Sequence, residues 1–424
     1  MQEYGKKKSS NFPDPLAPQQ EKSSEAYGAS YAKAIESQWG SLTNQNSLVR
    51  QRNKTFERNR EYANGTQDTN IYKQILTNLD PNNGDGSLVN LDYTPVPILP
   101  KFAKIVANKI LSRDPYPNLE AIDPISSSEK QQEKNRMKNQ VMLRDELLKL
   151  KEMTGGLVLG EDPESLPETM EEAEIFLETN VKTDAEIAAQ IGTNLTLSWS
   201  NFNDGIFRRV VNDLVALGMG VVKRSNDPSY GIKEEYVDPI NFIHSYTEDP
   251  GMNDLTYAGH IKRVSISELK RLAGDMFSEE DYKKIATTVA NNSGYDKSKM
   301  NDTQYDRSLN KTMYGYDEFM LDILDFEFVS TDCIFFEEKE NKYGNSGFFF
   351  EGYDYKEKKN SVFSRKPHKL EIQTIYGGSF IMGCDMLFDY GMKSNVPKNI
   401  HDISKARMSY SSISTNIRRM IPKS

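Results

Sequence analysis

An α+β fold is predicted for this chain of 424 residues, and three features of the sequence carry the prediction. Apolar residues in the first half recur at three- and four-residue spacing, which is typical of helices that bury one face. Between residues 221 and 264 the pattern changes to short extended runs punctuated by Asp-Pro pairs. Beyond residue 324 apolar and acidic residues alternate, as in β-strands. We therefore expect helical layers packed on small antiparallel β units, with a β-rich C-terminal part.

Composition and pattern divide the chain into four regions. Residues 1–26, rich in Lys, Ser, Pro and Gln, are expected to form a disordered tail. Residues 27–205 are expected to be helical, with a charged insert near 126–182. Residues 206–400 should combine helices with β-hairpins. Residues 401–424 are predicted to begin a basic helical region that is cut short.

The helical part begins with a pair of helices. Trp39 lies in the first, and the second ends at Asn64-Gly65, a typical C-cap. The second helix is basic and holds Arg50, Arg52, Lys54, Arg58 and Arg60. Its cations could contact DNA, form a solvated face or make salt bridges between subunits. A third helix, introduced by Pro97, is expected to carry Phe102, Ile105, Val106 and Ile110 on one face.

The stretch 202–272 has the most regular order of elements. Its helix should end at Gly218, because glycine takes the left-handed conformation without strain. Two strands with a polar turn follow, and then a third strand at 258–264. Ser265-Ile266-Ser267-Glu268 reads as a capping box at the start of the next helix, and Thr183-x-x-Glu186 as another one upstream.

The C-terminal half carries the β signals. Leu324, Phe326 and Phe328 alternate with acidic residues, which predicts a half-buried strand. Gly377-Gly378 is predicted to be the two-residue turn of a hairpin between 370–376 and 379–387, since such turns need positive φ angles.

Charge and composition limit the partners. The net charge is −9, whereas proteins that grip DNA neutralise phosphates with clustered Lys and Arg. If the chain meets DNA, we expect a surface that the polymer slides past; an acidic balance that merely keeps the protein soluble is the alternative. No apolar run approaches the roughly 20 residues that cross a bilayer. The two cysteines, Cys333 and Cys384, are expected to be free thiols of a protein made in a reducing cytosol.

Two glycine motifs resemble a phosphate-binding loop and a nucleophile elbow, but the residues around them differ from those that such loops need. A phosphate site needs a strand, then glycines, then a helix. In Gly218 to Lys223 the helix comes first, so a helix C-cap is favoured. Gly344-Asn345-Ser346-Gly347 lacks the Gly-x-Ser-x-Gly frame and a nearby His, so a β-turn is the better interpretation.

The sequence also gives little indication of a metal-binding site. Asp322, Asp325 and Glu327 could group around a metal ion, but an alternating acidic strand favours a solvated strand face. His244 and His260 have no Cys, Asp or Glu at ligand spacing. We therefore assign no catalytic, cofactor-binding or metal-binding residue and expect no enzyme activity and no cofactor.

Several local signatures occur in a fixed order. A helix pair has Trp39 in its first helix and Arg60 to Gln67 at the end of its second. A helix running into a strand at Leu217 to Val222 follows, then a strand and turn at Val237 to Phe242, then the strand Tyr257 to Arg263. This ordered set resembles the wing region of podovirus-type portal proteins of tailed double-stranded DNA bacteriophages. The charged insert and the Asn- and Tyr-rich composition are similar to those of crAss-like phages of gut bacteria.

The resemblance implies a portal wing-like fold and a homo-oligomeric ring of about twelve subunits, closed by repeated subunit contacts, at one vertex of the capsid. The protein would assemble in the host bacterial cytoplasm and reside in the virion. Double-stranded DNA would be packaged and ejected through the central channel, passing it non-specifically. The major capsid protein, head–tail adaptor proteins and the terminase packaging motor would dock around this conduit.

Portals of this class have no catalytic residue of their own. Family members continue into clip, stem helices, tunnel loop and crown, so the resemblance implies that this chain is the N-terminal part of a longer protein. DNA-channel residues therefore stay unassigned.

Two other hypotheses remain open. The first is another virion structural protein, such as a head–tail adaptor or minor capsid component, that uses the same helix-plus-β layers for assembly. The second is an enzyme of a different kind. Native mass spectrometry or negative-stain imaging separates the three, through a ring near twelve copies, a different stoichiometry, or a monomer with turnover.

Overall fold

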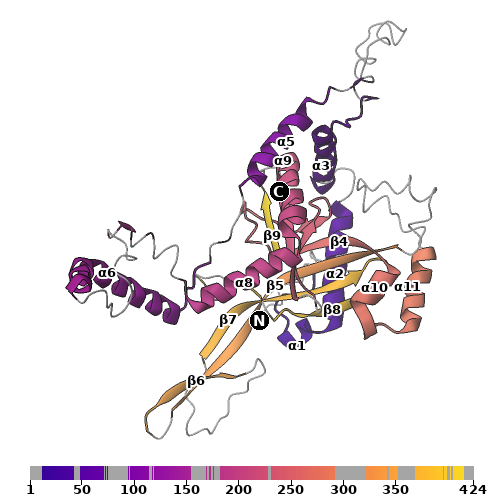
Figure 1. The fold of residues 1–424 in the computed structure, drawn as a ribbon. Helices are drawn as coiled ribbons and strands as arrows, with labels where there is room; N and C mark the ends of the chain where they lie inside the picture. The colour runs from indigo at the N-terminus through magenta and orange to yellow at the C-terminus, as the bar shows by residue number, and fades with distance from the viewer. Residues whose placement is uncertain are drawn as a thin grey trace. The chain divides into compact units, whose positions relative to one another are not determined.

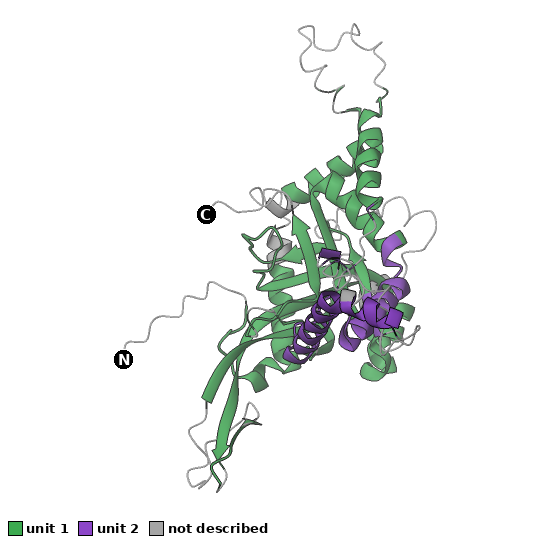
Figure 2. Ribbon diagram, turned by 60° about the vertical axis from the view of Figure 1, so that its left-hand side comes forward, with its two compact units in different colours: residues 1–112, 204–225, 234–424 green, residues 113–203, 226–233 purple. Residues whose placement is uncertain are grey.

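The computed structural model is mixed α+β, with antiparallel sheets and a strand-rich C-terminal part, as the sequence predicted (Figure 1). The chain divides into two compact units (Figure 2). Unit 1 comprises residues 1–112, 204–225 and 234–424, and unit 2 comprises residues 113–203 and 226–233. The residues that the structure describes are 12–42, 48–70, 72, 74, 94, 96–113, 117, 119–153, 169, 171–172, 175, 182–227, 231–291, 320–340, 343–351, 368–394, 396–398, 402 and 404–414.

Unit 1 contains a large antiparallel sheet with the strand order β3-β4-β5-β7-β8. Its strands are β3 (Phe242–His244), β4 (Tyr257–Ser265), β5 (Met320–Glu340), β7 (His368–Ile381) and β8 (Met386–Met392). β5 is the longest, at 21 residues, and a further strand, β6 (Ser346–Glu351), pairs with its second half.

The two edges of β5 are covered differently. β7 pairs along one edge from residue 323 to 336, and β4 pairs along the other from 320 to 328. β6 pairs with residues 335–340 and overlaps β7 at 335–336, so β6 must lie on the β4 edge. Residues 329–334 of β5 therefore have no described strand beside them on that edge.

A second sheet has the order β2-β1-β9. Its strands are β1 (Met219–Asp227), β2 (Gly231–Val237) and β9 (Tyr410–Ser414). β9 runs antiparallel to β1, from Met219 opposite Ser414 to Lys223 opposite Tyr410.

The predicted helical start at 401–424 is wrong where the structure describes it. In 410–414 burial alternates with period two, the period of a strand, and β1 offers an edge to pair with. The basic residues near 407 and 418–419 hid this alternation, and residues 415–424 lie outside the described part.

Helices surround the sheets of unit 1. They are α1 (Gln19–Lys22), α2 (Glu25–Leu42), α3 (Leu48–Asn64), α5 (Ile98–Leu111), α9 (Arg208–Leu217), α10 (Ile266–Ala273), the 3₁₀ turn η3 (Gly274–Met276) and α11 (Glu279–Asn291). α2 packs against β7 and β8, while α3, α5 and α9 pack against one another. A π-helical turn, η2 (Phe202–Phe207), precedes α9.

Unit 2 holds two long helices, α6 (Pro124–Met153) and α8 (Asp184–Trp199). The charged helix predicted over the first part of the insert is thus confirmed as α6. Glu186 ties the unit together, because its carboxylate accepts from the Ala121 backbone N–H at 2.7 Å and pairs with Lys130 at 2.5 Å. Most of the rest of the insert, between 154 and 181, lies outside the described residues.

Three apolar clusters fill unit 1. The first joins α2 to the large sheet through Ile35, Phe326 and Tyr376. The second lies around Val221 and Phe242 and connects the small sheet with β3 and β4. The third packs α10 and α11 on β5, β7 and β8.

The predicted helix ends are largely confirmed. Gly218 ends α9 with φ +76°, and Gly65 follows α3 with φ +75°. The Thr183 capping box forms in both directions, with Glu186 as its partner. At α10 the Ser265 hydroxyl accepts from the Glu268 backbone N–H at 3.3 Å, while the Glu268 carboxylate pairs with Arg271.

The predicted Gly-Gly hairpin turn is wrong. β7 runs straight through Gly377 and Gly378, and the turn to β8 lies at 382–385. The glycines serve close packing instead, since a Cβ on Gly377 would lie 2.9 Å from the Phe326 carbonyl oxygen and one on Gly378 would lie 3.0 Å from the Tyr390 backbone. The β7–β8 register also shifts here, as in a β-bulge.

The expectation of a disordered tail over residues 1–26 is also wrong where the structure describes it. Residues 12–26 pack against the rest of unit 1, with Ala17 and Lys22 buried. The Phe12 ring lies 5.0 Å from Tyr31 and 5.5 Å from Tyr257 between centroids. A polar composition therefore conceals an anchored segment, and residues 1–11 lie outside the described part. Among the described helices, none has both the length and the apolar character to cross a membrane.

Candidate functional site

The two glycine motifs behave as the sequence indicated. Gly218 and Gly220 stand between α9 and β1, and a Cβ on Gly220 would lie 2.8 Å from a Val210 side-chain carbon. Because the helix ends at these glycines, no helix N-terminus points at them. Gly344, with φ +81°, belongs to the turn before β6. Neither motif forms an anion-binding or nucleophilic loop.

The acidic face of β5 is largely covered, with Glu327 buried and the Asp325 side chain 17% exposed, which corrects the expectation of a solvated face. Asp325 forms an ion pair with Lys223 of β1 and lies 4.0 Å from the Lys262 ammonium group. Burial alone would raise the pKa of Asp325, but Lys223, His260 and Lys262 together hold it well below its usual value. The Asp325 carboxylate is therefore compensated by Lys223 of the small sheet and by Lys262 of β4, its neighbour in the large sheet.

His260 belongs to the same network. The Tyr410 hydroxyl donates to the Asp325 backbone carbonyl at 3.0 Å, so the 2.8 Å contact with His260 requires Nδ1 of the imidazole to donate. Burial, and then the positive charge of Lys223, lowers the pKa of His260 well below its ordinary value. Burial and the Asp325 carboxylate raise the pKa of Tyr410 well above its ordinary value. The imidazole is neutral, with a fixed tautomer.

Glu327 fastens the last described segment to the sheet. Its carboxylate accepts from the Ser409 backbone N–H at 2.9 Å and from the Ser409 hydroxyl. Together with Asp325, Lys223 and Tyr410, it makes a polar joint between β9 and β5. Among the described residues no group of three or more His, Cys, Asp or Glu side chains is arranged to hold a metal ion. We assign this joint a structural role.

The basic helix α3 turns two of its arginines inward. The Arg60 guanidinium donates two hydrogen bonds to Asp238, at 2.8 and 2.9 Å, and one to Asp213 at 3.0 Å. This forked geometry holds α3 to α9 and to the turn after β2. The Arg58 side chain is exposed, and that of Arg50 lies outside the described part.

Arg52 makes the second inward contact. It donates to His244 Nε2 and to the Phe242 carbonyl, both at 3.2 Å, and burial lowers its pKa to about 10. His244 in turn donates from Nδ1 to the Ser245 carbonyl at 2.7 Å. Burial, and then the Arg52 charge, lowers the pKa of His244 to about 4. These two arginines therefore stabilise the fold rather than offer a DNA-binding face.

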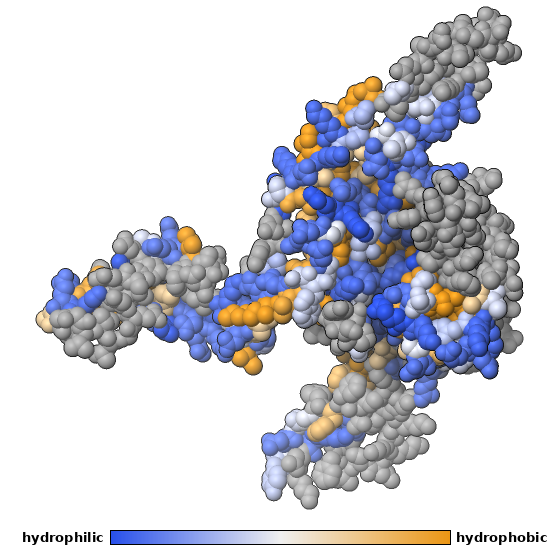
Figure 3. All heavy atoms as spheres, turned by 45° about the vertical axis from the view of Figure 1, so that its right-hand side comes forward, coloured by the Kyte–Doolittle hydropathy of each residue, from blue (hydrophilic) through white to orange (hydrophobic). Residues whose placement is uncertain are grey.

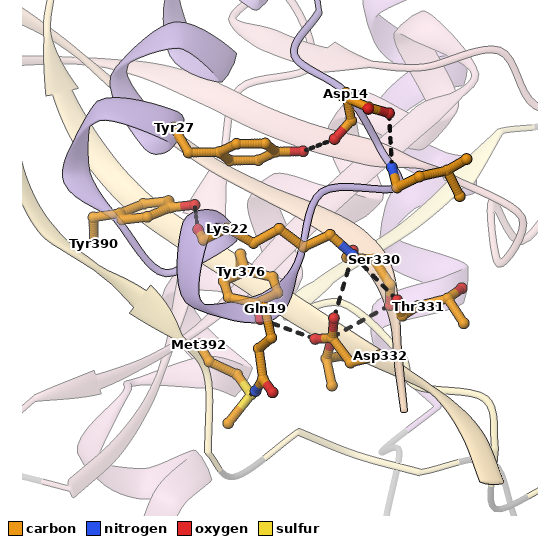
Figure 4. Close-up of polar contacts among 12 residues, drawn as sticks. Asp14, Gln19, Lys22, Tyr27, Ser330, Thr331, Asp332, Tyr376, Tyr390 and Met392 are labelled. Atoms are coloured by element: carbon orange, nitrogen blue, oxygen red, sulfur yellow. Dashed lines mark hydrogen bonds and ion pairs between the residues drawn. The ribbon is translucent and has the colours of Figure 1, made fainter. Parts of the chain in front are cut away.

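The third polar cluster anchors the N-terminal segment (Figure 4). The Lys22 ammonium group lies 3.3 Å from Asp332 Oδ1, and both side chains are 3% exposed. Asp332 Oδ2 also accepts from the Thr374 hydroxyl at 2.5 Å and from the Tyr376 hydroxyl at 2.9 Å. The Tyr390 hydroxyl donates to the Lys22 backbone carbonyl at 2.6 Å.

This anchor covers the edge of β5 that no described strand reaches. The Val329 N–H bonds to the loop before β4, and alternate residues of a strand direct their backbone groups to the same side. The Thr331 carbonyl therefore points to that edge, where Lys22 donates to it at 3.2 Å. Open strand edges promote pairing with other chains, so α1 also protects the sheet.

Both α5 and α8 leave large apolar side chains exposed. On α5 the exposed residues, at 37–59% exposure, are Ile98, Leu99, Phe102, Ile105, Val106 and Ile110. The helix packs instead through smaller groups, chiefly Ala107. On α8 the exposed residues, at 44–60%, are Ile187, Ile191, Leu195 and Trp199. Figure 3 shows apolar surface over both helices.

No family model matches the chain, and no curated protein matches it either. The residue spacing in α5 predicted its shared apolar face but not that this face is exposed. The three polar clusters could not be predicted, because their members lie far apart in the sequence. The lysine at position 22 carried no local signal that it pairs with Asp332.

Proposed function

We propose that this chain is a ring-forming subunit of a phage portal, the conduit through which double-stranded DNA enters and leaves a capsid. The observation that carries the proposal is the exposed apolar face of α5, six large side chains on a helix of 14 residues. Surfaces of this kind mark protein interaction sites. A protein whose function is assembly needs such a face.

The order of elements supports the portal among possible assemblies. A helix pair, a helix that ends at glycines before a first strand, three further strands and a capped helix occur in this order, as in the wing region that the sequence resembles. The proposed ring has about twelve subunits, a closed assembly of identical contacts. In the virion it would stand at one capsid vertex, after assembly in the host cytoplasm.

The proposed role is mechanical and electrostatic. With a net charge of −9 per chain, an assembled ring repels the phosphate backbone at short range and lets DNA slide. The two inward arginines of α3 are consistent with this, because they are engaged within the fold. The major capsid protein, head–tail adaptors and the terminase motor are the proposed docking partners.

The test is imaging of the purified full-length protein by negative stain, with native mass spectrometry for the copy number. A closed ring near twelve copies is the expected result, and a stable monomer at micromolar concentration overturns the proposal. A gel-shift titration adds a second arm. Weak binding of duplex DNA with little salt dependence is expected, whereas nanomolar binding with a steep salt slope contradicts a sliding channel.

A further inference from the structure

The exposed face of α5 has a regular geometry. Ile98, Phe102, Val106 and Ile110 follow one another at four-residue intervals, so they form a single row along the helix. The helix carries three lysines and no acidic residue, and the exposed Lys109 lies beside the end of this row.

α8 presents a matching row with the opposite charge. Ile187, Ile191, Leu195 and Trp199 also follow at four-residue intervals. The helix has two acidic residues and neither Lys nor Arg. Glu186 is engaged with Lys130 inside unit 2, so the exposed carboxylate is that of Asp184, at the first turn.

The two rows complement each other in length and charge when the helices are antiparallel. α5 and α8 have 14 and 16 residues, which correspond to about 21 and 24 Å. An antiparallel arrangement places the end of α5, with Lys109, beside the start of α8, with Asp184. It also brings the negative end of one helix dipole near the positive end of the other. A parallel arrangement would place these charges at opposite ends of the pair.

We propose that α5 of one subunit packs antiparallel on α8 of a second copy of this chain. In this register four pairs of apolar residues meet, with the middle pairs in closest contact because rows of this spacing cross at about −50°. The pairs are Ile98 with Trp199, Phe102 with Leu195, Val106 with Ile191, and Ile110 with Ile187. The inference rests on the proposed ring and names the contact that closes it.

This contact joins two different surfaces, so it is heterologous and repeats from subunit to subunit. A heterologous contact closes into a ring when its rotation permits. Two short helices cover only part of the roughly 800 Å² per partner that a stable pairwise complex needs. One such contact is therefore weak, and a ring, in which every subunit makes it twice, is stable.

Cysteine cross-linking of the full chain tests the register. In a background with Cys333→Ser and Cys384→Ser, one preparation carries Val106→Cys and a second, with a size tag, carries Ile191→Cys. After the two are mixed and mildly oxidised, we expect a disulfide-linked dimer that contains one tagged and one untagged chain. The matched control uses Asn108→Cys and Ala189→Cys, exposed residues off the two rows, and should give less than a tenth of that yield.

Three outcomes overturn the inference. They are the absence of the mixed dimer, an equal yield from the control pair, and a dimer from either single preparation alone, which would indicate a symmetric contact. Charge exchange provides a second measurement. Lys109→Glu should weaken association about two- to fivefold, and addition of Asp184→Lys should restore it.

Different results refute the α5–α8 contact and the proposed portal function. A closed ring near twelve copies without the cross-link rejects the α5–α8 contact and leaves the portal standing. The cross-link in an assembly of different stoichiometry supports the contact and rejects the portal.

Discussion

Replacement of Lys22 by Met tests whether the N-terminal segment is held by one buried ion pair. The change keeps the length of the side chain and removes its charge. Asp332 then stays 3% exposed, with Thr374 and Tyr376 as its remaining side-chain donors. Breaking a buried pair by removing one partner costs about 3–5 kcal/mol. Against a total stability of about 5–15 kcal/mol, this is a large fraction.

Lys33→Met is the matched control. Lys33 also lies on an N-terminal helix and pairs with a residue of the sheet region, Asp385, at 2.9 Å. Its side chain is 50% exposed and that of Asp385 is 63% exposed, so the loss should be below about 1 kcal/mol. The double variant Lys22→Met with Asp332→Leu should recover most of the loss, because it leaves no charge buried alone.

Hydrogen exchange of residues 12–35, together with urea unfolding, measures the effect. We expect backbone amides of α1 and α2 to exchange at least a hundredfold faster in Lys22→Met and at a nearly unchanged rate in Lys33→Met. Equal effects of the two substitutions, or no change in either, would refute the view that burial makes the Lys22 pair decisive.

Three further substitutions test other features. The pKa of His244 is about 4 in the fold and about 6.5 when unfolded, so its contribution is complete above pH 6.5 and is lost as the pH falls towards 4. His244→Gln should therefore remove up to about 3 kcal/mol of pH dependence from urea unfolding in that window, and an unchanged profile would contradict the low pKa. Gly377→Ala should cost about 2 kcal/mol or more in thermal unfolding because its Cβ meets the backbone, whereas Gly391→Ala, with open space around it, should be near neutral; similar costs would disprove the packing argument. Tyr410→Phe should cost about 1–3 kcal/mol by leaving His260 Nδ1–H without its acceptor, and nitrogen NMR that shows the other tautomer in the parent protein would contradict the assignment.

Local signals allowed the element ends to be predicted. Gly218 ends α9 because only glycine takes φ +76° without strain, and Thr183 begins α8 because its hydroxyl and Glu186 lie within one turn. Such interactions span a few residues and are therefore visible in sequence. Local signals also placed the predicted strand 258–264 close to the observed bounds of β4.

The errors concern residues whose environment depends on distant parts of the chain. Asp325 and Glu327 alternate with apolar residues as a solvated face would. They are covered instead by Lys223 of β1 and by Ser409, the residue before β9. Gly377 looks like a turn residue until Phe326 is known to lie beside it. On α5, periodicity identified the apolar face, but it could not show that the core takes the smaller Ala107 side instead.

The ion pair between Lys22 and Asp332 constrains the order in which the chain folds during synthesis. Its partner Asp332 is 310 positions further along the chain. At a synthesis rate of about 5–20 residues per second, the ribosome needs about 15–60 s to reach it. Closing a loop of this length costs about 5 kcal/mol of chain entropy, so the early segment docks only after most of unit 1 has formed. During this interval neither β5 nor β7 has been made, so the segment around Lys22 has no sheet to dock on.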